Sequence, residues 1–296
     1  MSEPPSEVRP GHLYVVATPI GNLGDLSPRA LKILDGVDLI AAEDTRVTGA
    51  LLAHFGVRTR MLALHEHNEA QAMGDVLDAL RKDRSVALVS DAGTPLISDP
   101  GFDLVREARA LGLPVVAVPG PSALLAALSV SGLPTDSFVF AGFLPAREEA
   151  RRHRLQELAA EPRSVILYES THRIEDTLRE LAALLGERRV CLARELTKLF
   201  EESRTARPAE LLAWLRADDN RRRGEFVLVI EGADPAAAAP REAERILRTL
   251  LKELGASKAA KLGAELTGLP RKELYAIAVR LGGHEAAVED NSGTDS

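Results

Sequence analysis

Short apolar runs alternate with amphipathic stretches along the first half of the chain. The runs are four to six residues long and rich in β-branched residues, and they cover 13–17, 37–42, 86–89 and 115–118. Because they are apolar on both faces, they are typical of buried parallel strands. Stretches of helical periodicity lie between them, for example 27–34 and 72–81. The alternation predicts an N-terminal α/β domain over residues 11–123, with helices on both faces of a parallel sheet.

A second set of strand-like runs follows residue 123. It comprises 138–143, 165–168, 190–194 and 226–230, with helical stretches such as 174–185 and 208–215 between the runs. These patterns predict a second α/β domain over residues 124–233. The boundary between the two domains falls within a predicted helix at 123–133.

The C-terminal part has a different pattern. Residues 234–240 are rich in Ala and Pro and are interpreted as a linker, and a helical segment follows at 241–283. Two short helices, 257–266 and 271–281, flank a Gly-containing turn, which predicts a helix-turn-helix-like shape. Ser257 suits an N-cap and Pro270 suits a first helical turn. The polar ends, 1–10 and 284–296, are predicted to be disordered tails.

Charge distinguishes the helical segment from the rest of the chain. Residues 241–280 contain nine Lys and Arg against five Asp and Glu, whereas the whole chain has a net charge of −7. The acidic total argues against non-specific coating of nucleic acid, but a local basic appendage is compatible with RNA contact. A small helical cap with a solvated face explains the charge equally well.

Composition narrows the class of protein. The chain has 296 residues, of which 45% are apolar, enough for two cores of ordinary domain size. A single cysteine, Cys191, excludes a disulfide within the chain and a cysteine-based metal site. No run approaches the roughly 20 apolar residues of a membrane span, and the N-terminus lacks a secretory pattern. We therefore expect a cytoplasmic protein with no membrane partner.

Small and polar residues follow four of the predicted strands. They occupy 18–25, 43–46, 90–95 with 98–101, and 119–122. Because ligands bind beyond the carboxyl ends of parallel strands, we expect a pocket at this edge, although turns favour the same residue types. The three-glycine dinucleotide fingerprint and the Gly-Lys-Ser/Thr phosphate loop are both absent, which argues against a dehydrogenase or an NTPase.

The same motifs, taken in order, carry a family resemblance. They lie at 18–23, 43–46, 90–95, 119–122, 143–145, 168–173, 193–198 and 224–227. Together they resemble the tetrapyrrole-methylase superfamily, and more narrowly its branch of 16S ribosomal RNA cytidine 2′-O-methyltransferases. The segment 257–281 resembles the C-terminal helical domain of that branch.

The resemblance implies an α/β fold class: two α/β domains with the cofactor cleft between them, plus a small C-terminal helical (helix-turn-helix-like) segment. It also implies a homodimer, S-adenosyl-L-methionine as cofactor, and 16S rRNA within the small ribosomal subunit as partner. The expected cofactor-binding residues are Ser90, Asp91, Ala92, Gly93, Thr94, Pro95, Ser122, Ala123 and Tyr168. The loop bearing Thr18, Pro19, Gly21 and Asn22 is expected to face the acceptor.

Basic residues inside the motifs are candidates for phosphate contact. They are Arg46, Arg173, Arg194 and Lys198. Phosphates dominate affinity for nucleic acid, so these side chains are interpreted as substrate-binding. The alternative is internal pairing with Glu43, Glu169, Glu195 or Glu201.

Methyl transfer to a ribose hydroxyl requires alignment of the reactants and a general base, but no metal. The catalytic candidates are Glu43, Asp44, His65 and Lys198. Asp44 is equally compatible with an ion pair to Arg46. The sequence His65-Glu66-His67 lacks a third ligand nearby and is weak as a metal motif, so we expect no metal site.

Two other functions remain open from the sequence. The first is methylation of a tetrapyrrole-like small molecule, which uses the same fold and cofactor. The second is a non-catalytic RNA-binding ribosome-assembly factor on the same scaffold. The basic helical appendage favours RNA over a small molecule as the acceptor.

Overall fold

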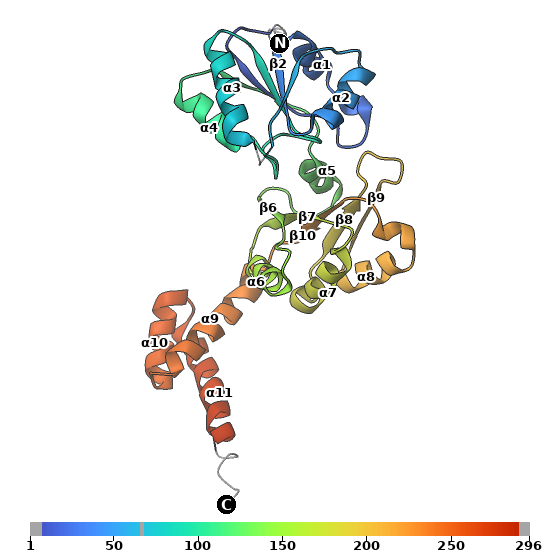
Figure 1. The fold of residues 1–296 in the computed structure, drawn as a ribbon. Helices are drawn as coiled ribbons and strands as arrows, with labels where there is room; N and C mark the ends of the chain where they lie inside the picture. The colour runs from blue at the N-terminus through green and yellow to red at the C-terminus, as the bar shows by residue number, and fades with distance from the viewer. Residues whose placement is uncertain (1–7, 66–67, 290–296) are drawn as a thin grey trace, which may run out of the picture. The chain divides into compact units, whose positions relative to one another are not determined.

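The computed structural model describes residues 8–65 and 68–289, which divide into two units. A two-sheet unit extends to residue 231 without 157–163, and a helical unit contains 157–163 and the residues from 232 onward. Figure 1 shows an α/β part followed by a helical part, which confirms the predicted fold class. None of the helices within the described ranges combines the length and apolar character needed to cross a bilayer.

The first sheet is wholly parallel, with the strand order β3-β2-β4-β1-β5. The strands are β1 (Leu13–Val16), β2 (Leu39–Ala42), β3 (Met61–Ala63), β4 (Val86–Val89) and β5 (Val115–Val118). Four of them are the predicted apolar runs. The prediction omitted β3, because three half-buried residues at a sheet edge leave no apolar run to detect.

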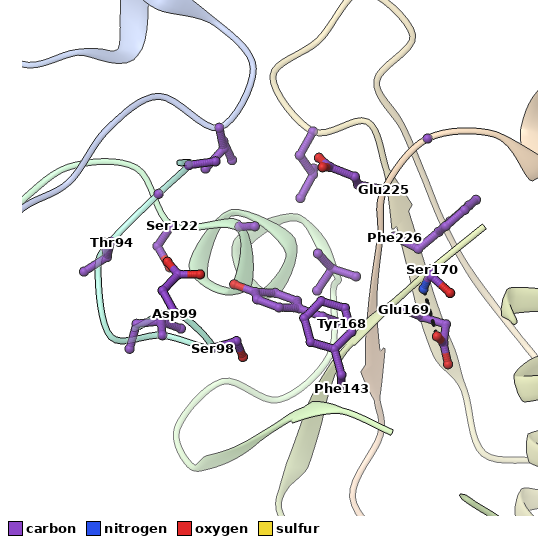
Figure 2. A pocket seen from close by; sticks show the side chains of 18 of the residues that line it. Thr94, Ser98, Asp99, Ser122, Phe143, Tyr168, Glu169, Ser170, Glu225 and Phe226 are labelled. Atoms are coloured by element: carbon purple, nitrogen blue, oxygen red, sulfur yellow. Dashed lines mark hydrogen bonds between the residues drawn. The ribbon is translucent and has the colours of Figure 1, made fainter. Parts of the chain in front are cut away.

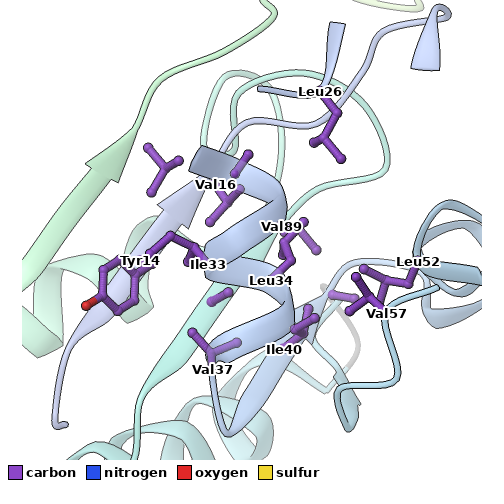
Figure 3. Packing of buried hydrophobic residues seen from close by; sticks show 14 residues of the cluster. Tyr14, Val16, Leu26, Ile33, Leu34, Val37, Ile40, Leu52, Val57 and Val89 are labelled. Carbon is purple, nitrogen blue, oxygen red and sulfur yellow. The ribbon is translucent and has the colours of Figure 1, made fainter. Parts of the chain in front are cut away.

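Helices cover both faces of this sheet, because alternate strand residues point to opposite sides. The helices are α1 (Pro28–Gly36), α2 (Thr45–His54), α3 (Glu69–Arg81) and α4 (Phe102–Ala110). On one face Tyr14 and Val16 pack with Ile33 and Leu34 of α1 (Figure 3). On the other face, Leu13 and Leu88 pack with apolar residues of α3 and α4.

The second sheet is mixed, with the strand order β6-β7-β10-β8-β9. The strands are β6 (Phe138–Phe143), β7 (Ser164–Glu169), β8 (Val190–Arg194), β9 (Glu202–Ala206) and β10 (Phe226–Ile230). Only β6 and β7 run parallel, and the other neighbours are antiparallel. The prediction omitted β9, a polar edge strand with two exposed residues that lacks an apolar run.

Four helices complete the two-sheet unit. They are α5 (Ala123–Val130), α6 (Glu148–Ala159, except for residues 157–159), α7 (Ile174–Leu185) and α8 (Pro208–Arg216). Leu124 and Leu128 of α5 pack with Ile166 and Val229 of the second sheet. The helix predicted to contain the domain boundary therefore belongs to the second core. Cys191 is fully buried in this core.

The helical unit contains α9 (Pro235–Leu251), α10 (Ala256–Thr267) and α11 (Arg271–Glu289). The small residue Gly263 allows close packing, because a Cβ there would lie 3.2 Å from Leu247 Cδ2. Leu247, Ala260 and Leu274 are fully buried in the core of this unit. The predicted pair of helices around a Gly-containing turn is present.

The predicted linker and tails differ from the structure. Helix α9 begins at Pro235, because Ala has the highest helix propensity and Pro is tolerated in a first turn. Helix α11 continues to Glu289, so the predicted C-terminal tail is partly helical. At the other end, Val8 packs against the first core and the Arg9 N–H donates to Tyr14. Residues 1–7 and 290–296 lie outside the described residues.

Candidate functional site

The strand exits of both sheets surround a cavity of about 400 Å³ in the two-sheet unit (Figure 2). The loop after β4 and the start of α5 provide one wall, and the end of β7 and the start of β10 provide another. The lining residues are Ile20, Ala92, Gly93, Thr94, Ile97, Ser98, Asp99, Ser122, Ala123, Phe143, Tyr168, Glu169, Ser170, Thr171, Leu196, Gly224, Glu225, Phe226 and Val227.

Backbone hydrogen bonds tie the loop after β4 to the loop after β1. The Thr18 N–H donates to Gly93 O at 2.8 Å, and the Gly93 N–H donates to Thr18 O at 3.0 Å. Gly93 has φ +84°, and a Cβ there would lie 3.3 Å from Ile20 Cγ2. The Thr94 hydroxyl donates to Pro121 O at 3.0 Å. Glycine is therefore required where three strand exits meet at the cavity.

Aromatic rings form the second wall. The Tyr168 ring lies edge-on to Phe140 and Phe143, with centroids 4.9 and 5.5 Å away. Burial raises the pKa of the Tyr168 hydroxyl, so this group is neutral at physiological pH. Phe226, almost fully buried, continues the apolar surface. Such a wall suits a flat, mostly apolar ring, while Thr94, Ser98 and Ser122 provide polar contacts opposite it.

Asp99 brings a carboxyl into the cavity, where it faces Tyr168 (Figure 2). Burial raises the pKa of the Asp99 carboxyl, the nearby Ser90 hydroxyl lowers it, and the negative charge of Asp91 raises it again. The net result is a pKa above the ordinary value. A carboxylate of this kind is a stronger base than an exposed aspartate.

Six of the nine expected cofactor residues line the cavity: Ala92, Gly93, Thr94, Ser122, Ala123 and Tyr168. The other three support its wall or lie beside it. Ser90 is buried beneath the loop, and Asp91 Oδ1 accepts a hydrogen bond from the Asp44 N–H at 3.0 Å. Pro95 is buried within the loop itself.

The expected catalytic carboxylates differ in their surroundings. Burial raises the pKa of Glu43, whose Oε2 accepts from the Asp91 N–H at 3.3 Å. Asp44 instead accepts from the Arg46 N–H at 2.8 Å as the N-cap of α2, and pairs with the Arg46 guanidinium at 2.5 Å. These Arg46 contacts lower the pKa of Asp44 to about 2, which makes it a weak base.

The other two catalytic candidates lie on different elements. His65 follows β3 and lines a second cavity together with Glu43; Glu66 and His67 lie outside the described residues. Lys198 Nζ lies 3.0 Å from Glu195 Oε1 and 2.8 Å from Glu225 Oε2. Burial lowers the pKa of Lys198, but these two carboxylates outweigh it and raise the pKa overall. Lys198 is therefore a cation at neutral pH.

The first residues of the loop expected to face the acceptor are buried and stabilise the fold. Thr18 and Pro19 are buried, and the Thr18 hydroxyl donates to Ser90 O. Gly21 allows Lys198 to approach, since a Cβ at Gly21 would lie 2.4 Å from Lys198 Cγ. Asn22 caps a short helical turn by accepting from the Gly24 N–H at 3.0 Å.

Two of the three candidate arginines, Arg173 and Arg194, form ion pairs within the protein, which is the alternative to phosphate contact. Arg173 lies 2.9 Å from Glu169 and donates to Leu144 O at 2.9 Å. The Arg194 side chain is only 7% exposed, pairs with Glu202 at 3.2 Å and donates to several backbone carbonyls. Arg46, by contrast, has a side chain that is 90% exposed. Its guanidinium is accessible to a phosphate although it pairs with Asp44.

Several lining residues were not among the expected site residues, notably Asp99, Phe143, Glu225 and Phe226. A signal was present for Asp99, because residues 98–101 follow a strand with the composition of a ligand-binding loop. Phe143 and Phe226 belong to strands whose apolar pattern indicates only a core. Their exposure to the cavity follows from how the two sheets meet.

Two family profiles match the chain. Residues 12–212 match the tetrapyrrole (corrin/porphyrin) methylases, and residues 237–282 match the RsmI C-terminal HTH domain. Ribosomal RNA small subunit methyltransferase I of Xylella fastidiosa (strain Temecula1) is 57% identical over 268 residues, covering 90% of this chain and 98% of that protein. The protein of the same name from Escherichia coli O157:H7 is 53% identical over 271 residues, 91% of this chain and 95% of that one.

Solved structures share the fold at lower identity. A uroporphyrin-III-C-methyltransferase from Thermus thermophilus has a TM-score of 0.53 at 20% identity, covering 75% of this chain and 94% of that one. Cobalt precorrin-4 methyltransferase has a TM-score of 0.55 at 18% identity, covering 74% and 94%. A Thermus thermophilus uroporphyrin-III C-methyltransferase complexed with S-adenyl homocysteine has a TM-score of 0.51 at 20% identity, covering 74% and 97%.

Proposed function

We propose that this chain, which belongs to the tetrapyrrole (corrin/porphyrin) methylase family, methylates the 2′-hydroxyl of a cytidine in 16S ribosomal RNA of the small ribosomal subunit. The chain is a methyltransferase, and S-adenosylmethionine is its methyl donor. The observation that carries the choice of acceptor is the relatedness at 57% and 53% identity, over about nine-tenths of the chain, to enzymes named for the ribosomal RNA small subunit.

The helical unit supports RNA over a tetrapyrrole-like acceptor. Lys258, Lys261 and Lys272 are exposed on α10 and α11, and no ion pair involves them among the described residues. Exposed lysines on one small module attract phosphates, which a small-molecule methylase has no need to bind. The exposed Arg46 guanidinium at the start of α2 is our proposed phosphate contact in the two-sheet unit.

The cavity among the strand exits fits the methyl donor in size and chemistry. Its volume of about 400 Å³ falls in the usual range for small-molecule sites, and its wall combines aromatic rings with hydroxyls. We infer that Tyr168 and Phe143 exclude water around the donor, and that Thr94 and Ser122 orient it. The bound donor supplies an activated methyl group, so the protein mainly has to align the reactants.

We propose a homodimer as well, which acts in the cytoplasm where ribosomal subunits mature. Leu199 and Phe200 are 89% and 67% exposed on the loop between β8 and β9, and Leu125 and Val130 of α5 are half exposed. Exposed apolar side chains of this size favour burial against another protein surface. Sedimentation velocity of the purified protein tests this: a single species of monomer mass at micromolar concentration would contradict it.

The proposed acceptor is tested by transfer of tritium from labelled S-adenosylmethionine. Small ribosomal subunits that lack their own modification are the substrate, and large subunits and a porphyrinogen serve as controls. We expect label in one nuclease fragment of 16S RNA and none in either control. Label in the porphyrinogen alone would establish the small-molecule function. Donor binding without transfer to any acceptor would favour the assembly factor.

A further inference from the structure

A second cavity, of about 580 Å³, adjoins the donor cavity in the two-sheet unit. Ser98 and Asp99 belong to the walls of both cavities. The residues that line the second cavity are Glu43, His65, Glu69, Ser98, Asp99, Pro100, Gly101, Phe102 and Asp103. A side chain at the shared wall is within reach of a ligand in either cavity. When a methyl group passes from a donor in one cavity to a hydroxyl in the other, the base that takes the hydroxyl proton has to be within such reach.

Asp99 is the only ionisable side chain that the two cavities share among the residues described. It forms no ion pair with any described cation, in contrast to Asp44 and Glu169. The buried Ser90 hydroxyl lies near Asp99 and lowers the pKa of its carboxyl. The Ser90 hydroxyl itself has no hydrogen-bond partner of normal geometry among the described residues. The Asp99 carboxylate is therefore not neutralised by a described cation and remains available to a ligand in either cavity.

Phe102 offers an aromatic surface on the second cavity. It is the first residue of α4 and is 65% exposed. The guanidinium of Arg106 lies 5.6 Å from its ring centroid on the same helix. Proteins that bind single-stranded RNA stack unpaired bases on exposed aromatic rings of this kind. The ring has no other evident role, because it contributes little to either core.

Fixed carboxylates make this cavity unsuitable for a phosphate. Glu43 Oε2 accepts from the Asp91 N–H and Glu69 Oε1 from the Gly101 N–H, both at 3.3 Å. Each carboxylate retains a second oxygen that can accept from a donor inside the cavity. An exocyclic amino group of a nucleobase is such a donor, and carboxylates accept from cytosine N4 in other nucleic-acid complexes. The cavity thus favours the base and sugar of a nucleotide.

We propose that the second cavity receives the acceptor nucleotide, with its base against Phe102, and that Asp99 is the general base for the reacting hydroxyl. This inference rests on the proposed RNA acceptor. As the bond between the acceptor oxygen and the methyl carbon forms, the bond from that carbon to sulfur breaks. The electron pair of the broken bond stays on sulfur, which leaves as a neutral thioether, and the hydroxyl proton moves to the Asp99 carboxylate.

The test of Asp99 is the Asp99→Asn variant, which keeps the size of the side chain and removes the basic oxygen. Its control is Asp78→Asn on α3, an exposed carboxylate paired with Arg81. We expect kcat for methylation of small subunits to fall about 10²- to 10⁴-fold in Asp99→Asn. Donor affinity measured by calorimetry and KM for the subunit should each change less than about tenfold, or 1.4 kcal/mol.

Two results would overturn the role of Asp99. One is a kcat within tenfold of the wild type. The other is a loss of donor affinity as large as the loss of rate, which would assign Asp99 to donor binding. If the wild-type protein itself transfers no label to small subunits, it is the proposed function that fails, and the two failures are thereby distinguished.

The test of Phe102 is a rise in KM rather than a fall in kcat. Loss of one stacked base weakens binding about five- to 150-fold, so Phe102→Ala should raise KM for the subunit by a factor in this range. Phe102→Trp should restore KM, and Leu111→Ala, which removes an exposed apolar side chain just beyond α4, should leave it unchanged. An unchanged KM in Phe102→Ala would refute the placement of the base.

Discussion

Removal of the Glu169 carboxylate should destabilise the two-sheet unit strongly. Its side chain is fully buried at the end of β7 and accepts from three donors. The Ser170 N–H donates at 2.8 Å, the Thr177 hydroxyl at 2.7 Å and the Arg173 guanidinium at 2.9 Å (Figure 2 shows the first contact). Arg173 also donates to Leu144 O, so one carboxylate connects β7, the start of α7 and the segment after β6.

The magnitude follows from what Glu169→Ala leaves behind. The Arg173 side chain is only 21% exposed and would lose its counter-charge, while a buried hydroxyl would lose its acceptor. Breaking a buried ion pair by removing one partner costs about 3–5 kcal/mol. Glu169→Gln keeps the shape and one acceptor oxygen, and should cost about 1–3 kcal/mol.

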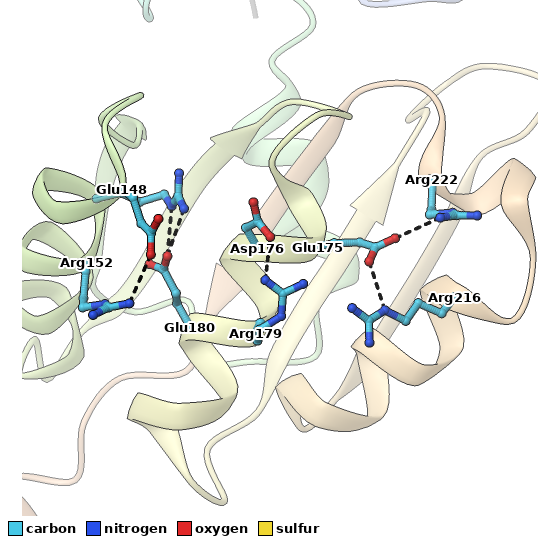
Figure 4. Close-up of polar contacts among 9 residues, drawn as sticks. Glu148, Arg152, Glu175, Asp176, Arg179, Glu180, Arg216 and Arg222 are labelled. Atoms are coloured by element: carbon cyan, nitrogen blue, oxygen red, sulfur yellow. Dashed lines mark hydrogen bonds and ion pairs between the residues drawn. The ribbon is translucent and has the colours of Figure 1, made fainter.

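Urea unfolding measured by tryptophan fluorescence tests this prediction. Trp214 is the only tryptophan of the chain and lies on α8, which packs against α7, so its signal reports on this unit. The control is Glu175→Ala, because Glu175 accepts from Arg216 and Arg222 at the surface (Figure 4). Surface pairs contribute about 0–1 kcal/mol.

A difference of less than about 1 kcal/mol between Glu169→Ala and Glu175→Ala would refute this reasoning. Arg173 would then not depend on Glu169 for its position. Its guanidinium would be available for a phosphate, which is the role that the sequence motif first suggests.

Three further predictions concern the cavity, pH and salt. Gly93→Val places a β-branched side chain at φ +84° and should weaken donor binding about tenfold or more, as measured by calorimetry. Hydrogen bonds from the Ser85 hydroxyl and N–H lower the pKa of Asp38 below 3.8, so their contribution to stability is present above that pH and is lost as pH falls through the lower pKa. The difference in thermal midpoint between the wild type and Asp38→Asn should therefore narrow in acid, and a constant difference would contradict this. Replacement of Lys258 and Lys261 by Ala should lower the salt slope of RNA binding by about 0.7–0.9 per contact, and an unchanged slope would exclude both from phosphate contact.

The sequence was informative wherever a local pattern determines the structure. Runs such as 86–89 and 226–230 became strands at the predicted residues, because short apolar runs rich in β-branched residues are typical of strands buried on both faces. Residues 92–94 of the loop at 90–95 line the cavity, since the carboxyl ends of parallel strands are where ligands bind.

Pairing and orientation could not be predicted from local patterns. The segment 202–206 is polar and joins the sheet only because β8 offers a free edge, so no apolar run marks it. The motif arginines look alike in sequence, but Arg194 points into the protein and Arg46 points to solvent. The composition of residues 98–101 indicates a ligand-binding loop, but it does not show that Asp99 lies between two cavities, because that position depends on how two loops and two sheets meet.

The most direct test of the central claim is alkaline hydrolysis of 16S RNA that the protein has methylated with labelled S-adenosylmethionine. A methyl group on a 2′-oxygen prevents that oxygen from attacking the adjacent phosphodiester, so the linkage survives alkali. We predict that the label is recovered in an alkali-resistant dinucleotide whose 5′ nucleoside is 2′-O-methylcytidine. Recovery of the label in a mononucleotide would show methylation of a base and would contradict the proposed reaction.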